Sequence, residues 1–141
     1  MTASQSLATL ERFARYVESG AADASAALFA PEATYSEPPS FALAGRPAIH
    51  AFLTDFADRH HTVTFALLRT LASPDGSLVA AEWRFAHTRD ADGERKVYEG
   101  MSWTEFADGL ITRWHGYSAR LDRAPDARAT GDEEGSAGRQ G

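Results

Sequence analysis

Apolar residues recur at intervals of three and four along the first part of the chain, which is the spacing of one helix face. The first stripe consists of Leu7, Leu10, Ala14 and Val17, flanked by Phe13 and Tyr16. The second consists of Ile49, Phe52, Leu53 and Phe56. Gly20 ends the first predicted helix, because glycine readily takes the left-handed conformation that closes a helix. Gly45 and Pro47 mark the start of the second, since proline needs no hydrogen-bond partner in a first turn.

A shorter helix is predicted between these two, over residues 23–29, with Asp23 as its N-cap. Pro31 prevents its continuation. An extended segment is predicted over residues 33–38. It ends at Pro38 and Pro39, because proline cannot donate to a sheet ladder.

From Thr62 onward the period of the apolar pattern falls to two, which is typical of strands. Four long strands are predicted, from 62 to the turn at 73–76, then at 78–88, 96–106 and 110–119. Turns rich in proline, aspartate and glycine separate them. Helices followed by an antiparallel meander of strands predict an α+β fold.

The length of 141 residues predicts one domain, over residues 1–122. Residues 123–141 contain no large apolar side chain and are predicted to form a disordered tail. The net charge of −6 and the absence of a basic run argue against nucleic acid and anionic membrane surfaces as partners. The chain has no cysteine, which excludes thiolate chemistry. No signal peptide or membrane-spanning run is recognised, so a cytoplasmic location is predicted.

Three segments carry a resemblance to a known family: residues 11–35, with Leu-Phe-Ala-Pro-Glu-Ala-Thr-Tyr at their end, Gly-Arg-Pro-Ala-Ile at 45–49, and Phe-Ala-Asp-Gly-Leu-Ile-Thr-Arg-Trp at 106–114. Their order and spacing resemble the nuclear transport factor 2-like superfamily, in its SnoaL-like branch, over about residues 5–120. The resemblance implies a cone, in which three helices pack on a strongly curved antiparallel sheet and enclose an apolar pocket. No cofactor is predicted. The resemblance also implies a homodimer through the convex side of the sheet, where Met101 and Trp103 would project.

The resemblance also suggests a site. Glu37, just before Pro38, matches the base of the ketosteroid isomerases, but their oxyanion donors fall on Phe13 and Ser102. Phe13 cannot donate a hydrogen bond, so Tyr16, one turn along, is the possible substitute. Efficient steroid isomerisation is therefore not expected, since one lost oxyanion donor costs about 10²–10³ in rate.

Limonene epoxide hydrolase-like enzymes give a second comparison. Tyr35 matches a tyrosine of their water-binding set, whereas the positions of their arginine and two aspartates fall on Trp83, Phe85 and Gly116. The set that activates water in those enzymes is therefore missing from this chain. SnoaL-type cyclases also use an acidic base, although Glu37 does not align with it.

Strand alternation predicts which side chains face the pocket. If Trp83 faces inward, Phe85 and His87 do so as well, and Tyr35 shares one face of its strand with Glu37. The predicted ligand-binding residues are Phe13, Tyr16, Tyr35, Trp83, Phe85, His87, Ser102 and Trp114, and Glu37 is the candidate base. His60 and His61 lack a third ligand at suitable spacing, so no metal site is predicted.

Three functions stay open from the sequence. The first is a cofactor-independent isomerase, cyclase or hydrolase that uses Glu37 as a base on an apolar carbonyl compound. The second is a non-catalytic module that binds an apolar metabolite. The third is a protein-interaction domain that uses the sheet surface. Glu37 itself has an alternative role, since a glutamate at a strand end could reach solvent or pair with Arg46.

Overall fold

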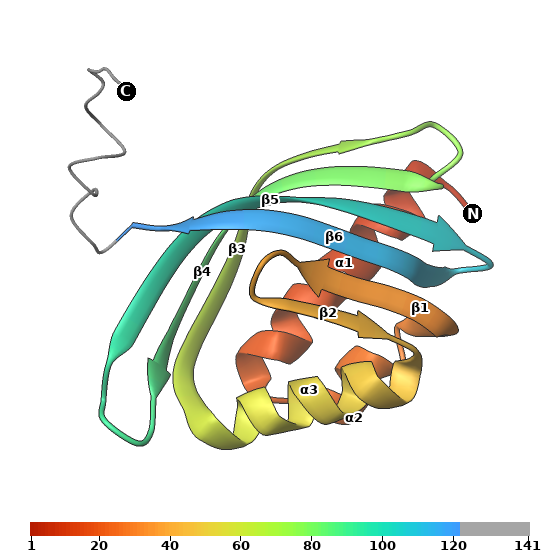
Figure 1. Cartoon of the computed structure of the whole chain (residues 1–141). Helices are drawn as coiled ribbons and strands as arrows, with labels where there is room; N and C mark the ends of the chain where they lie inside the picture. The colour runs from red at the N-terminus through yellow and green to blue at the C-terminus, as the bar shows by residue number, and fades with distance from the viewer. Residues whose placement is uncertain (122–141) are drawn as a thin grey trace, which may run out of the picture.

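Three helices and two short strands come first in the chain, and four long strands follow (Figure 1). The computed structural model describes residues 1–121, so the predicted domain boundary at 122 and the predicted tail at 123–141 lie outside the described residues. The elements are α1 Ala3–Ser19, α2 Ala22–Ala26, β1 Phe29–Glu37, β2 Phe41–Ala44, α3 Arg46–Arg59, β3 His60–Ala72, β4 Leu78–Arg89, β5 Arg95–Ala107 and β6 Leu110–Arg120. The predicted α+β fold is confirmed. No helix within residues 1–121 is long and apolar enough to cross a membrane.

Helix α1 begins and ends with local signals in the sequence. The hydroxyl of Thr2 accepts from the backbone N–H of Gln5, while the Gln5 side chain accepts from the backbone N–H of Thr2. This capping box satisfies donors that the first turn leaves unpaired. Gly20 closes the helix in the left-handed conformation, with φ of 73°. Leu10, Ala14 and Val17 of the predicted stripe are buried together with Phe13, whereas Leu7 is half-buried.

The segment between α1 and α3 differs from its prediction. Helix α2 ends at Ala26, and Asp23 lies inside its first turn without capping it. The Asp23 carboxylate instead contacts His50 Nε2 of α3, at 2.6 Å. Strand β1 begins at Phe29, whose side chain is fully buried, and not at Ala33. It is therefore longer than predicted. Strand β2, which the sequence pattern did not predict, pairs antiparallel with β1 after the Pro38-Pro39 turn.

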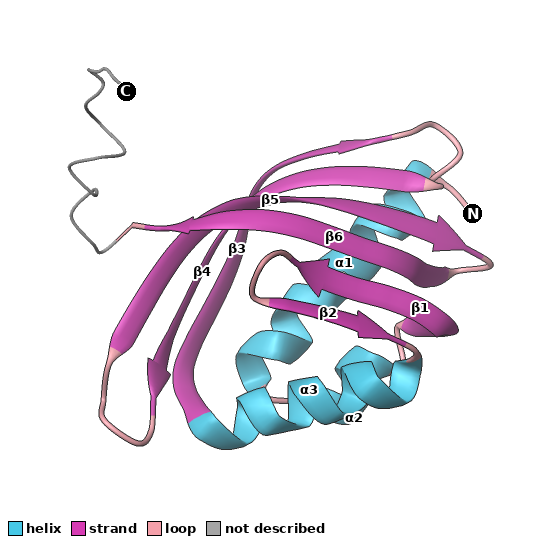
Figure 2. Ribbon diagram, in the orientation of Figure 1, coloured by secondary structure: helices cyan, strands magenta, loops and turns pink. Residues whose placement is uncertain are grey.

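The six strands form one open, curved sheet in the order β2-β1-β6-β5-β4-β3 (Figure 2). The four long strands form the predicted antiparallel meander. The sheet is not antiparallel throughout, because β1 and β6 run parallel. A parallel pair needs a long crossover connection, and here α3 with the meander supplies it. Helix α1 packs against β3 and β4, and α3 packs against β1 and β2, so the helices cover the inner face of the sheet.

Candidate functional site

A cavity of about 260 Å³ lies between the inner face of the sheet and α3. Its apolar wall consists of Val17, Phe41, Phe52, Leu53, Phe56, Phe65, Trp83, Phe85 and Trp114. Six residues bring polar groups to it: Tyr35, Glu37, Ser40, His60, His87 and Tyr98. An aromatic wall with a few polar groups is the composition of a small-molecule site.

Two glycines make room for the two tryptophans of the wall. A Cβ on Gly100 would lie 2.6 Å from Cη2 of Trp83, and one on Gly116 would lie 2.7 Å from Cη2 of Trp114. The indole rings therefore occupy the space that a larger residue would fill at either position. The two rings lie 5.9 Å apart between centroids and form one side of the cavity.

Glu37 lies at one end of the cavity, where β1 ends. Its Oε1 accepts a hydrogen bond from Ser118 Oγ of β6, at 2.6 Å. Tyr35, two residues earlier on the same face of β1, is buried against the Trp114 ring. Burial raises the pKa of the Tyr35 hydroxyl, and the negative charge of Glu37 raises it further. The hydroxyl therefore stays protonated at neutral pH and is a hydrogen-bond donor beside a carboxylate acceptor.

Arg46 does not pair with Glu37. Its guanidinium donates two hydrogen bonds to the backbone carbonyl of Phe29, at 2.9 and 2.6 Å. Glu37 is therefore not held by that arginine, and its carboxylate contributes to the cavity lining.

Two histidines lie at another part of the wall. His87 is only 7% exposed, and its ring contacts those of Phe56, Phe85, Tyr98 and His60. Burial lowers its pKa to about 4, and repulsion from His60, Lys96, Arg95 and Arg120 adds to this effect. His87 is therefore a neutral imidazole at pH 7. Its Nδ1 is buried without a hydrogen-bond partner among the described residues.

His60 follows the last turn of α3, as the sequence predicts for a helix-to-strand junction. Its Nδ1 lies 2.8 Å from the backbone carbonyl of Phe56. Because a carbonyl only accepts, Nδ1 carries the proton in this bond, and in the neutral ring Nε2 is the acceptor. His60 also lines the cavity, a role that the sequence did not reveal.

The sequence was compared with models of known protein families. A model of the SnoaL-like domain matches residues 10–114. The chain belongs to the SnoaL-like domain family. A search of curated proteins gives no match in sequence. The SnoaL-like domain is nevertheless similar in structure to several solved proteins.

An LEH-like epoxide hydrolase of M. tuberculosis superposes with a TM-score of 0.73 at 19% identity, over 83% of this chain and 84% of that one. The epoxide hydrolase/cyclase-like enzyme SalBIII, of pyran ring formation in the polyether salinomycin, gives 0.73 at 19%, over 82% of this chain and 92% of that one. A Catenulispora acidiphila protein with a ketosteroid isomerase-like fold, solved with trimethylamine, gives 0.69 at 15%, over 77% and 83%. At these identities the likeness shows the fold alone.

The SnoaL-like domain brings six of the predicted site residues together around the cavity: Tyr35, Glu37, Trp83, Phe85, His87 and Trp114. Three others do not line it. Phe13 is fully buried, with its ring edge-on to Phe29, Tyr35 and Phe65. Tyr16 lines a separate small hollow beside α2 and α3. Ser102 is buried next to Gly116, the residue beneath the Trp114 ring.

Several cavity residues were not predicted, although some had a signal in the sequence. Phe52 and Phe56 belong to the apolar stripe of the second long helix. Tyr98 alternates with Gly100 and Ser102, so the same period of two identifies it. No sequence signal joins Ser118 to Glu37, because their contact spans 81 positions. Within residues 1–121, no group of three or more His, Asp or Glu side chains is placed to hold a metal ion.

Proposed function

We propose that this SnoaL-like domain binds a small apolar carbonyl compound in the cavity, and that Glu37 moves a proton on it without a cofactor. One observation carries the proposal: the Glu37 carboxylate lies in the lining of a largely aromatic cavity, with the Tyr35 hydroxyl on the same strand face. An acceptor and a donor side by side are the groups that proton transfer next to a carbonyl requires.

The chemistry follows from the roles of the two groups. Ser118 holds Oε1 of Glu37, so Oε2 is the oxygen that takes a proton from the carbon next to the carbonyl. The electron pair of the broken C–H bond moves into an enolate, whose oxygen accepts a hydrogen bond from Tyr35. Return of the proton from Glu37 to another carbon gives an isomer. Alternatively, the enolate carbon attacks a second carbonyl group of the same molecule, so that a C–C bond forms as the C=O π bond opens, and the resulting alkoxide takes the proton back from Glu37.

The structural neighbours support this range of reactions. Their names include an epoxide hydrolase, an epoxide hydrolase/cyclase-like enzyme and a ketosteroid isomerase-like fold. In the sequence resemblance to limonene epoxide hydrolase-like enzymes, the positions of their water-binding arginine and first aspartate fall on Trp83 and Phe85, and both residues form apolar wall of the cavity. Isomerisation or ring closure therefore fits the cavity better than hydrolysis.

The test begins with a thermal-shift screen of terpenoids, phenols, steroids and aromatic polyketides against wild type and Glu37→Gln. The bicyclic ketone 1-tetralone is then used as a defined probe. Exchange of its α-protons in D₂O, followed by NMR, measures proton abstraction directly. We expect wild type to catalyse exchange and Glu37→Gln to lose at least about 10² of the rate, which is the usual contribution of a positioned base.

Glu32→Gln is the matched control, because it makes the same change on an exposed residue of the same strand. Its exchange rate should equal that of wild type. If ligands stabilise both wild type and Glu37→Gln but no exchange occurs in either, the domain is a binding module and the catalytic part of the proposal is wrong.

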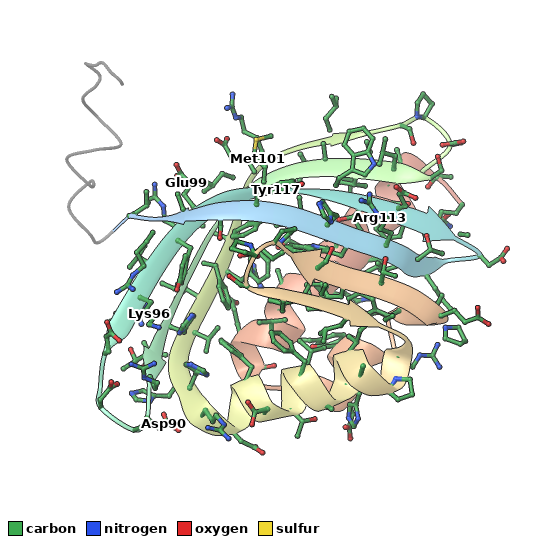
Figure 3. The ribbon with its side chains drawn as sticks, in the orientation of Figure 1. Asp90, Lys96, Glu99, Met101, Arg113 and Tyr117 are labelled. Carbon is green, nitrogen blue, oxygen red and sulfur yellow. The ribbon has the colours of Figure 1, made fainter. Side chains whose placement is uncertain are left out.

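We also propose that two copies of the chain pair through the outer face of the sheet. Leu71, Met101, Trp103 and Tyr117 form an apolar patch there, each between 48% and 76% exposed. Figure 3 shows Met101 and Tyr117 projecting from this face. Exposed tryptophan and methionine are typical of a surface that a partner covers.

A second copy is the partner that the charges favour. Around the outer-face patch lie ion pairs of both signs: Arg69–Glu82, Arg84–Glu99 and Arg113–Glu105. A patch with both signs on its rim is complementary to itself after a two-fold rotation, because each cation can face an anion of the other copy.

A further inference from the structure

Lys96 is the only lysine of the chain, and it stands directly beside His87 in the sheet. Side chains of paired residues on antiparallel strands point to the same face. His87 lines the cavity, so Lys96 lies on the inner face as well. Figure 3 shows it on the limb of β5 that leads to the turn marked by Asp90.

The positive charge of Lys96 is not paired with a carboxylate anywhere in residues 1–121. The acidic residues of the neighbouring turn are already occupied: Asp90 contacts His61, and Asp92 and Glu94 contact Arg89. The positive charge of Lys96 repels a proton on His87, a residue of the cavity wall, and so helps to lower the pKa of that histidine. A charge of this kind at the edge of an apolar cavity favours an anion there.

His87 adds a second, independent feature. It is more than nine-tenths buried in the cavity wall, and its Nδ1 has no partner within the described part of the chain. Buried polar atoms without a partner are uncommon in proteins, and a bound water or ion is one explanation for them. Of the five such side-chain atoms in residues 1–121, the Nδ1 of His87 is the one beside a cationic side chain in the sheet. Two neighbouring residues of the inner face therefore carry groups without a partner in residues 1–121: the Nδ1 atom of His87 and the ammonium group of Lys96.

This place is remote from Glu37. Ser118, the partner of Glu37, lies beside Gly100 of β5, whereas His87 lies beside Lys96. From Gly100 to Lys96 the strand rises about 13 Å, at roughly 3.3 Å per residue. Glu37 lines the cavity at one part of the sheet, and Lys96 stands beside the cavity residue His87 at another, so a negative and a positive side chain lie far apart along the inner face.

We propose that His87 and Lys96 form an anion subsite, and that the ligand carries a carboxylate at the end remote from its reacting carbonyl. The inference rests on the proposed function, because it takes the cavity as the ligand site. A cavity of about 260 Å³ lies just below the usual range of roughly 300–1,000 Å³ for small-molecule sites. The ligand class is thus a keto acid of one or two rings.

The test compares 1-tetralone with 1-tetralone-6-carboxylate, which differ only in the acid group. Isothermal titration calorimetry measures the dissociation constant of each for wild type, Lys96→Gln, Lys96→Arg and His87→Gln. Wild type should bind the carboxylate about tenfold more tightly, as expected for one charge-assisted contact near solvent. Lys96→Gln should reduce that preference without changing affinity for 1-tetralone, since Lys96 is not part of the cavity lining. His87→Gln should also reduce the preference, and Lys96→Arg should keep it.

Arg84→Gln is the matched control, because it removes the same charge from the outer face of the neighbouring strand. It should keep the preference for the carboxylate. Equal affinity of wild type for both probes, or a preference that survives in Lys96→Gln, overturns the anion subsite while leaving the proposed function in place. If wild type binds neither probe, both proposals are wrong for this ligand class.

Discussion

His87 illustrates how a cavity changes the chemistry of a single residue. Its ring is shielded from water by contacts with the rings of Phe56, Phe85 and Tyr98. Burial disfavours the charged imidazole, and the neighbouring cations disfavour it further. At the Glu37 end the same physics acts on Tyr35, whose hydroxyl keeps its proton. Both residues therefore enter the cavity as neutral hydrogen-bonding groups at pH 7.

This shift predicts a dependence of stability on pH. The pKa of His87 is about 4 in the folded chain and 6.5 ordinarily, so between these values the unfolded chain binds more protons. Its contribution is fully present above pH 6.5 and is lost as the pH falls towards 4. Urea unfolding at pH 7 and pH 4.5 should show a larger loss of stability in wild type than in His87→Gln. Equal losses in the two proteins contradict the assignment.

The lowered pKa values of Asp75 and Asp92 act at lower pH than this window. Hydrogen bonds from Ser77 lower the pKa of Asp75 to about 2, and Arg89 lowers that of Asp92 to about 2. Their contributions are lost below their ordinary value of 3.8, beneath the lower pH of the experiment.

At the scale of elements, the glycines of β5 and β6 determine where the tryptophans lie. Strands disfavour glycine in their interior, and its presence often marks a close approach of another group. Here the Trp83 ring lies over Gly100, and the Trp114 ring lies over Gly116. The cavity wall is therefore shaped by residues that have no side chain.

Gly116→Ala should displace the Trp114 ring, because the new Cβ would lie 2.7 Å from Cη2 and 3.1 Å from the backbone oxygen of Met101. Overpacking of this kind costs about 1–3 kcal/mol. Urea unfolding measures the loss, and tryptophan fluorescence should shift as the ring moves. Gly93→Ala is the control: its Cβ meets nothing within 4 Å, so only its φ of 69° adds strain, and the emission should not change.

Arg46 connects two elements beside the cavity. Its two hydrogen bonds to the carbonyl of Phe29 fix the start of α3 to the start of β1. Arg46→Met should cost about 1–3 kcal/mol, the range for a lost charge-assisted bond to a partly buried carbonyl. Arg59→Met, at the exposed end of the same helix, breaks only the pair with Asp55 and should cost about 0.5 kcal/mol or less. Equal losses in urea would show that the Phe29 contact adds nothing.

At the scale of the whole molecule, the sheet has two faces with different roles. The inner face carries the cavity, and the outer face carries the patch of Leu71, Met101, Trp103 and Tyr117. Because side chains alternate along each strand, Ser102 is buried inside while Met101 and Trp103 project outside. A dimer can therefore form without closing the cavity.

The proposed dimer gives a direct measurement. Wild type should sediment as a dimer at micromolar concentration, and Trp103→Glu should sediment as a monomer, because a buried unpaired carboxylate is costly. Leu121→Glu is the control, since Leu121 is also exposed but lies past the end of β6. It should remain a dimer. A wild-type monomer at this concentration contradicts the proposal.

The sequence by itself determined the helices, the meander of strands and which side chains face inward. These follow from local periodicity: a period of 3.6 places Phe52 and Phe56 on one helix face, and a period of two places Trp83 and Phe85 on one strand face. The glycine stop of α1 at Gly20 and the turn at Asp108-Gly109, all with positive φ, depend on a few neighbouring positions, so they too were predicted from the chain. The predicted N-cap Asp23 was wrong, because its carboxylate contacts His50 instead.

Only the tertiary structure decided how the inward residues divide between core and cavity. Phe13 and Ser102 face inward as predicted, but packing against Phe29 and beside Gly116 leaves them outside the lining. Likewise, the contact of Ser118 with Glu37 and the parallel pairing of β1 with β6 join parts of the chain that are far apart in sequence. Periodicity fixes the direction of a side chain, whereas depth depends on what the rest of the chain places above it.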